Sequence, residues 1–392
     1  MRDKETKAEA GDKPKVDQTP FIEANQKAKS RYGRFNIGIV GGTGVGKSSL
    51  VNAVFGRDSA KVGKGLPVTE GVHYYHDESL GIWDFAGFEI GTREAPGEAL
   101  NRHLDSVSKA PAHEQIAIVW YCLNSRADRL TQADIEMIRG LDERGLAVIL
   151  VLTKVDWSKN AVTGSYSPPK DVAEFAAWLK APMDDETKQP IEVPLQRVIL
   201  TSAHSKNGKG TGHGLGELVK ETLALSPDDE KDAFRIAQRL NLTWKKEMAT
   251  PIIGAAATAA AAAAAIPIPI ADAVSLAPIQ MTMMGRIAAI YDLELKTMMP
   301  TSTLAQIGAQ IAGKAAARSF LKLVPGAGSV VNAAVAFALT AATGAGWLRL
   351  CEHVHTGKVD IAHIADAWND YSPTLMAVVK LMAERKVRTA EN

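Results

Sequence analysis

Short apolar runs alternate with amphipathic stretches through the first half of the chain. The apolar runs that predict buried strands are Phe35–Val40 and residues 81–85, 115–122, 147–153 and 197–201. Helical spacing of apolar residues predicts helices at Lys47–Phe55 and at residues 100–109, 131–144 and 172–180. Strands that alternate with helices of this length predict a mostly parallel sheet between helices. We therefore expect an α/β domain over residues 34–226, ending where Pro227 breaks the pattern.

The pattern changes after residue 226, where alanine becomes the dominant residue. An unbroken alanine run covers residues 259–265. The charged residues between Pro251 and Leu348 are only Asp272, Arg286, Asp292, Glu294, Lys296, Lys314, Arg318 and Lys322. Alanine is the best helix former and strand signals are scarce, so we expect residues 227–392 to be an all-α domain.

The first 33 residues are rich in charged and small residues and have almost no apolar periodicity. We interpret them as a flexible charged tail with a short helix near residues 21–30. The whole chain has 45 Lys and Arg against 44 Asp and Glu. This balance excludes a global electrostatic attraction to nucleic acid, so a nucleic-acid partner is not expected.

The location of the protein follows from its cysteines and its amino terminus. The two cysteines, Cys122 and Cys351, cannot form a disulfide framework and fit a reducing compartment. No signal-peptide core occurs in the first thirty residues, so we expect a cytoplasmic protein, either free or bound at the inner membrane.

Two apolar runs decide whether the alanine-rich region spans a bilayer. Residues 252–266, between Pro251 and Pro267, make ~22 Å of helix, which is shorter than a hydrocarbon core of ~30 Å. The uncharged run 329–348 reaches ~30 Å and can span. Two interpretations stay open: a helical bundle that is soluble or peripheral, and a hairpin that inserts. A helix at 232–248 packs on the α/β domain or lies on a membrane surface.

A phosphate-binding loop follows the first predicted strand. Residues 41–48, Gly-Gly-Thr-Gly-Val-Gly-Lys-Ser, satisfy the pattern GxxxxGK[ST] and precede a predicted helix. The loop amides and the helix N-terminus supply donors for a polyphosphate. Lys47 would bridge the β- and γ-phosphates, and the Ser48 hydroxyl would hold Mg²⁺.

Three further signals, each at the end of a predicted strand, select guanine over adenine. Asp84, in Asp-Phe-Ala-Gly, is placed to contact Mg²⁺, and the Gly87 amide to bind the γ-phosphate. In Thr-Lys-Val-Asp at 153–156, the Asp156 carboxylate would accept from N1–H and the 2-amino group of guanine. A backbone amide of the segment Thr201-Ser202-Ala203 would meet O6. The residues predicted to contact the nucleotide are Gly42, Thr43, Gly44, Val45, Gly46, Lys47, Ser48, Ser49, Thr153, Lys154, Asp156, Ser202 and Ala203.

These motifs, in this order, resemble the translation-factor-like GTPases of the TrmE–Era–EngA–septin group over about residues 34–225. The Era-like members are the most similar, with a loop G-x-T-G-x-G-K-S-S-L-x-N-A-x-F-G that residues 41–56 match. The resemblance implies a Ras-like G domain and assigns Thr69 as the switch I threonine. Mg²⁺ would then be held by Ser48, Thr69 and Asp84, and catalysis would rest on Lys47, Thr69 and Gly87. The alanine-rich region resembles a helical domain that often follows bacterial G domains.

Several features depart from the resemblance. Many relatives have Asp-Thr-Pro-Gly where this chain has Asp84-Phe85-Ala86-Gly87, and Thr153 replaces the more common Asn. Phe88 stands where Ras-type enzymes place a water-orienting glutamine, so hydrolysis is expected to be slow without a partner or a homodimer.

We expect a GTP-hydrolysing switch whose helical domain reports the nucleotide state to a membrane or protein effector. The alternatives are a scaffold that nucleotide only stabilises and an Era-like RNA- or ribosome-associated GTPase.

Overall fold

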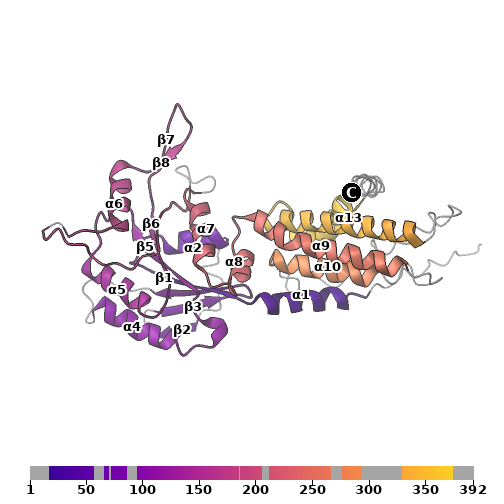
Figure 1. Cartoon of the computed structure of the whole chain (residues 1–392), viewed down its shortest axis with the longest axis horizontal. Helices are drawn as coiled ribbons and strands as arrows, with labels where there is room; N and C mark the ends of the chain where they lie inside the picture. Colours follow the sequence, from indigo (N-terminus) through magenta and orange to yellow (C-terminus); the bar gives the residue numbers. More distant parts are fainter. Residues whose placement is uncertain are drawn as a thin grey trace, which may run out of the picture. The chain divides into compact units, whose positions relative to one another are not determined.

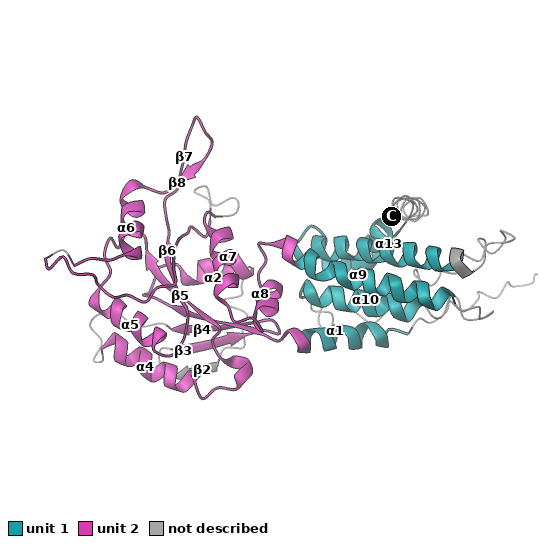
Figure 2. Ribbon diagram, in the orientation of Figure 1, with its two compact units in different colours: residues 1–30, 245–392 teal, residues 31–244 magenta. Residues whose placement is uncertain are grey.

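The computed structural model describes residues 17–56, 66–69, 72–85, 95–184, 186–204, 212–265, 276–293 and 329–373. The chain divides into two compact units, residues 1–30 with 245–392 and residues 31–244 (Figure 2). The helical unit is therefore built from both ends of the chain, with the other unit between them in sequence. These boundaries differ from the expected divisions after residues 33 and 226.

Residues 31–244 contain a sheet that, in the described segments, has seven strands in the order β2-β3-β4-β1-β5-β6-β9 (Figure 1). The strands are β1 Phe35–Val40, β2 Leu66–Thr69, β3 Val72–His76, β4 Leu80–Phe85, β5 Ile118–Asn124, β6 Val148–Thr153 and β9 Arg197–Leu200. The five strands β4, β1, β5, β6 and β9 are parallel, and β2 and β3 add an antiparallel edge. The expected mostly parallel α/β sheet is confirmed, whereas the two antiparallel strands β2 and β3 were not predicted.

The central strands are apolar on both faces because helices cover both. Along β5 and β6, alternate residues enter two separate cores. One core contains residues of α4 (Pro96–Val107), α5 (Gln132–Asp142) and α6 (Lys170–Lys180). The other contains residues of α2 (Lys47–Phe55), α7 (Leu215–Leu225) and α8 (Lys231–Ala237). Figure 1 shows α2 and α7 on the opposite face from α4 and α5. This burial explains the near-continuous apolar runs in the sequence.

The strand register brings the ends that carry the motifs to one edge of the sheet. Val40, the last residue of β1, pairs with Phe85 of β4 and with Tyr121 of β5. Asn124, the last residue of β5, pairs with Thr153 of β6. The phosphate loop, the segment after Asp84 and the Thr-Lys-Val-Asp motif therefore begin side by side.

The predicted helix at 232–248 is wrong as a single element. It is interrupted after α8, and α9 (Leu242–Ala265) begins beyond the break. The fully buried Gln238 side chain fills the gap: its Oε1 accepts from the amides of Leu240 and Asn241, and its Nε2 donates to the carbonyl of Asn241. Phe234 of α8 packs against Phe35, with ring centroids 4.8 Å apart, which favours the expected packing on the α/β unit.

The other unit is helical. Its described helices are most of α1 (Thr19–Tyr32) and α9, together with α10 (Leu276–Ile290), α13 (Ser329–His355) and α14 (Ile364–Tyr371). Buried polar side chains fix their registers. Gln280 Nε2 donates to Thr340 Oγ1 over 3.1 Å, and Trp347 Nε1 donates to the Met284 carbonyl over 2.8 Å. Gln280 is thus paired inside the bundle, while Asp272 lies outside the described residues.

The short helix expected near residues 21–30 is confirmed, but the interpretation of this stretch as part of a solvated tail is wrong. Residues 19–32 form α1, and the Phe21 ring is fully buried, with its centroid 6.0 Å from that of Trp347. The backbones of α1 and α10 lie so close together that a Cβ on Gly285 would be 2.2 Å from the Phe21 carbonyl oxygen. Asn25 also donates to the Gly285 carbonyl over 3.0 Å. A helix with few apolar residues can therefore still pack in the bundle, because a glycine on the neighbouring helix lets the two backbones come close together.

The expectation about the two apolar runs is also corrected. Pro251 does not bound the first run but lies inside α9, whose 24 residues extend ~36 Å. By length and composition, two described helices could cross a membrane, Leu242–Ala265 and Asn332–His355. The apolar window of the first is 22% buried and that of the second 61% buried. The run judged long enough to span is therefore largely buried, and the run judged too short is the more exposed one.

Candidate functional site

The phosphate loop takes a conformation that its glycines make possible. Gly41, Gly44 and Gly46 all have positive φ, at 144°, 73° and 109°. A Cβ on Gly41 would lie 2.3 Å from the carbonyl oxygen of Cys122 in β5, so a side chain cannot be accommodated there. Gly46 caps the N-terminus of α2 in the left-handed conformation. The backbone can therefore curve around a phosphate chain in front of that helix terminus.

Lys47, the first residue of α2, turns its side chain back over the loop. Its Nζ donates to the carbonyls of Gly41 and Gly42, over 2.6 and 3.2 Å. The ammonium group is thus held at the mouth of the loop, where a polyphosphate would replace these carbonyls as its partner.

Asp84 lies in β4 beside β1, paired with Ile39. Its Oδ1 is buried and has no hydrogen-bond partner in the described part of the chain. Burial raises the pKa of Asp84, and the nearby charges of Lys47 and His73 oppose that rise. A buried carboxylate oxygen with an open coordination position, near the charge of Lys47, fits a magnesium ion bound directly or through water.

The other predicted magnesium and switch residues are only partly described. Ser48 lies in the first turn of α2 and is exposed. Thr69 is the last residue of the edge strand β2. Gly87, together with Phe88, lies outside the described residues.

Thr153 connects the Thr-Lys-Val-Asp segment at 153–156, here called the guanine motif, to the phosphate loop. Its hydroxyl oxygen lies 2.6 Å from the carbonyl oxygen of Val45 and 3.0 Å from that of Leu123, and it donates toward both. The next residue, Lys154, has φ +56° and donates from Nζ to the Gly44 carbonyl over 2.5 Å. The alkyl chain of Lys154 therefore crosses from the motif to the loop.

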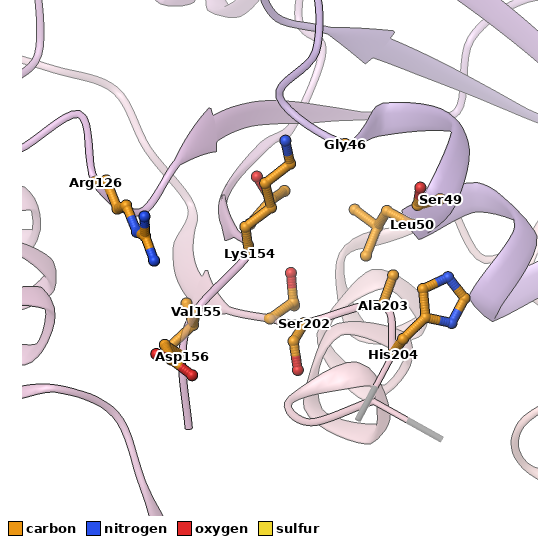
Figure 3. Close-up of a pocket in the computed structure, with 12 residues that line it drawn as sticks. Gly46, Ser49, Leu50, Arg126, Lys154, Val155, Asp156, Ser202, Ala203 and His204 are labelled. Carbon is orange, nitrogen blue, oxygen red and sulfur yellow. The ribbon is translucent and has the colours of Figure 1, made fainter. Parts of the chain in front are cut away.

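A cavity of about 390 Å³ opens between these segments (Figure 3). It is lined by Gly46, Ser49, Leu50, Arg126, Thr153, Lys154, Val155, Asp156, Thr201, Ser202, Ala203 and His204. Residues of the phosphate loop and first helix, the Thr-Lys-Val-Asp motif and the Ser-Ala segment thus share one cavity. Of the predicted nucleotide contacts, Gly42, Thr43, Gly44, Val45, Lys47 and Ser48 lie on the loop and first helix turn beside it.

The cavity is also lined by residues that were not predicted from the sequence: Leu50, Arg126, Val155 and His204. Arg126 follows the end of β5, and in Figure 3 it lies on the opposite side of the cavity from Ser49 and His204. No described residue pairs with the Arg126 guanidinium. Its position directly after an apolar strand, at the edge where the other motifs lie, was the signal available in the sequence.

Comparison with known proteins agrees with this geometry. Residues 36–154 match the model of a family described as 50S ribosome-binding GTPase. No curated protein matches the chain. Among solved structures, one similar to this chain is a probable GTP-binding protein engB, at 18% identity, covering 48% of this chain and 97% of that one, with a TM-score of 0.33.

Another similar structure is an ADP-ribosylation factor-like GTP-binding protein, the small COPII coat GTPase SAR1 from Encephalitozoon cuniculi, in complex with GDP. It is 15% identical and covers 59% of this chain and 91% of that one, with a TM-score of 0.29. The family match and the loop define the class: the chain carries a P-loop GTPase domain with a mostly parallel sheet, accompanied by a helical unit.

Proposed function

We propose that the protein binds GTP and GDP with Mg²⁺ at this site, hydrolyses GTP, and acts as a nucleotide-controlled switch. The observation that carries the proposal is the shared cavity, which residues of the first helix, Asp156 and Ala203 line together. A phosphate cradle alone does not distinguish nucleotides. A phosphate-binding loop can select guanine when a carboxylate and a backbone amide beside it can bind the hydrogen-bonding edge of the base.

Each predicted residue has a role in this proposal. The loop amides from Gly42 to Ser49 and the Lys47 ammonium would hold the phosphates. Ser48, Thr69 and Asp84 would hold the magnesium ion, which neutralises charge on the β- and γ-phosphates when bound. The Gly87 amide would bind the γ-phosphate, so hydrolysis would release both the Thr69 and Gly87 segments. Asp156 would read the base edge and the Ala203 amide would meet O6.

Hydrolysis should be slow in the isolated protein. Phe88 stands where a glutamine would orient the attacking water. A second copy of the chain or a protein partner would then supply the missing group. Multiple-turnover phosphate release by the wild type, measured against Lys47→Ala, tests the activity. Release no faster than that of Lys47→Ala would favour the nucleotide-stabilised scaffold instead.

The metal role of Ser48 has its own test. Ser48→Asn should weaken binding of Mg²⁺–GTP more than binding of GDP, because the hydroxyl serves the metal that the γ-phosphate shares. Equal losses for the two nucleotides would contradict the assignment.

The helical unit would couple the nucleotide state to an effector, and the exposed apolar window of α9 makes a membrane surface our first choice. The protein would then be cytoplasmic and associate with the inner membrane. Flotation with liposomes should differ between GTP-analogue-bound and GDP-bound protein, since a switch acts only through differential affinity. Thr69→Ala should abolish the difference and keep GDP binding. Flotation that is independent of nucleotide would contradict the coupling.

The description of the matching family supports a second candidate, a ribosome-associated GTPase of the Era-like group. Co-sedimentation of GTP-analogue-bound protein with isolated 50S subunits would support it. Flotation with liposomes, without such co-sedimentation, would favour the membrane effector.

A further inference from the structure

Guanine recognition in the proposed function depends on two loops that leave different strands. Asp156 follows β6, and Ser202 and Ala203 follow β9. The carboxylate and the Ala203 amide must keep a fixed separation to read opposite ends of one base edge. At the strand ends, the Val155 amide donates to the Thr201 carbonyl over 3.0 Å. Beyond that bond, other contacts must hold Asp156 in place.

The backbone of residues Gly212–Gly214 packs closely against the end of β9. The Ser202 amide donates to the His213 carbonyl over 3.0 Å, and the His213 amide donates to Ser202 Oγ over 3.1 Å. A Cβ on Gly212 would lie 1.6 Å from the Ser202 carbonyl oxygen, and one on Gly214 would lie 1.9 Å from that of Leu200. Glycines therefore flank His213 because only a backbone without side chains can approach β9 this closely.

The His213 ring reaches from this segment to the other recognition loop. Its centroid lies 5.5 Å from that of Trp157, the residue directly after Asp156. The centroid of the Tyr166 ring lies 4.2 Å from that of the same His213 ring. Tyr166 belongs to the small hairpin of β7 (Ser158–Lys159) and β8 (Tyr166–Ser167), which follows Trp157 in the chain. The three rings connect both ends of the loop after β6 to a residue hydrogen-bonded to Ser202.

We propose that His213, Trp157 and Tyr166 form a positioning cluster that fixes Asp156 relative to Ser202 and Ala203. None of the three residues lines the cavity. They act through Asp156, and the β7–β8 hairpin is thereby coupled to guanine binding. The inference rests on the proposed function, since it assigns the cluster to the same nucleotide site.

The experiment uses the ratio of GDP affinity to inosine diphosphate affinity in the full-length protein. Inosine lacks the 2-amino group, so the ratio reports how well Asp156 meets that group. Loss of the ring contacts should lower the GDP:IDP ratio by about 2- to 10-fold, the range that aromatic pairs of this kind support. A cluster that only stabilised the fold would lower the melting temperature and leave the ratio unchanged.

Tyr166 provides the safest variants because its side chain is 49% exposed. Tyr166→Ala and His213→Ala should both lower the ratio, and Tyr166→Phe should restore it because the ring is kept. Val162→Ala is the matched control: Val162 lies in the same hairpin, is 94% exposed and should leave the ratio at the wild-type value.

Hydrogen exchange supplies an independent readout. GDP should slow exchange of the amides of residues 158–167 in the wild type and in Val162→Ala, and less so in His213→Ala. A wild-type ratio in both Tyr166→Ala and His213→Ala, with GDP still bound, would overturn the positioning cluster. Failure of the wild type to bind GDP would instead overturn the proposed function.

Discussion

The hydroxyl of Thr153 lies 2.6 Å from the carbonyl oxygen of Val45, so the first residue of the guanine motif is hydrogen-bonded to the phosphate loop. Thr153 is almost fully buried, and the same hydroxyl also faces the Leu123 carbonyl. The segment proposed to read the base and the loop proposed to hold the phosphates are thereby fixed to each other.

Thr153→Val should break this connection while keeping the shape of the side chain. The loss of one buried hydrogen bond costs about 0.5–1.5 kcal/mol, and an unpaired carbonyl adds to that cost. We expect GDP affinity to fall by about 2- to 10-fold in a calorimetric titration. Thr153→Ser keeps the hydroxyl and should bind GDP as the wild type does. A serine variant as weak as the valine variant would show that the methyl group, and not the hydrogen bond, matters.

Asp156→Asn should exchange one base preference for another. The amide cannot accept from both N1–H and the 2-amino group of guanine, so GTP affinity should fall by about 10- to 150-fold, corresponding to 1.5–3 kcal/mol. Xanthine carries a 2-oxo group that accepts from the new amide, so xanthosine triphosphate should gain affinity. Competition binding with both nucleotides measures the exchange, and unchanged GTP affinity in the variant would remove Asp156 from base recognition.

Asp84→Asn should stabilise the nucleotide-free protein. Burial raises the pKa of Asp84 above its ordinary value of 3.8, so the folded state disfavours the charged form. The stability contributed by the neutral form is present below that ordinary value and is lost as the pH rises through the raised pKa. At neutral pH the variant should therefore melt higher than the wild type, and the difference should shrink toward pH 4.

The same variant should weaken the magnesium dependence of GTP binding, because a neutral amide is a poorer ligand for the ion. Thermal melts across the pH range, with and without Mg²⁺ and GTP, separate the two effects. A lower melting temperature for Asp84→Asn at pH 7 would show that the carboxylate has a stabilising partner.

Phe21→Ala should destabilise the helical unit although it lies near the amino terminus. The ring is fully buried against Trp347, and truncation of a buried phenylalanine costs about 3–5 kcal/mol. Denaturant unfolding followed by tryptophan fluorescence measures the loss. Glu23→Ala, at an exposed position of the same helix, is the control and should change stability by less than about 0.5 kcal/mol. Equal effects of the two changes would contradict the packing of α1.

The central strands of the sheet were predictable because both of their faces are apolar. The antiparallel strands β2 and β3 were not, since polar residues such as His73 interrupt the apolar pattern and β3 has only one buried face. The loop residues from Gly41 to Ser48 could be assigned because their spacing is local in sequence. His213 could not, because its place depends on contacts between segments distant in the chain.

In the helical unit, the course of α9 through Pro251 and the burial of α1 were not predicted. Pro251 was expected to bound the first apolar run, yet α9 continues through it although a proline inside a helix removes a hydrogen bond. The alanine run that follows has the highest helix propensity, which favours continuation. The contribution of α1 was not predicted because a buried face of three residues, Phe21, Asn25 and Ala28, is too sparse to stand out in a charged segment.

The central claim is that this cavity binds a guanine nucleotide, and the affinities of the full-length protein for GTP, GDP and ATP in the presence of Mg²⁺ test it most directly. The account predicts that GTP and GDP bind at least about 100-fold more tightly than ATP, because Asp156 and the Ala203 amide have no matching groups on adenine. ATP affinity equal to that of GTP would contradict the account, as would the absence of binding by any of the three nucleotides.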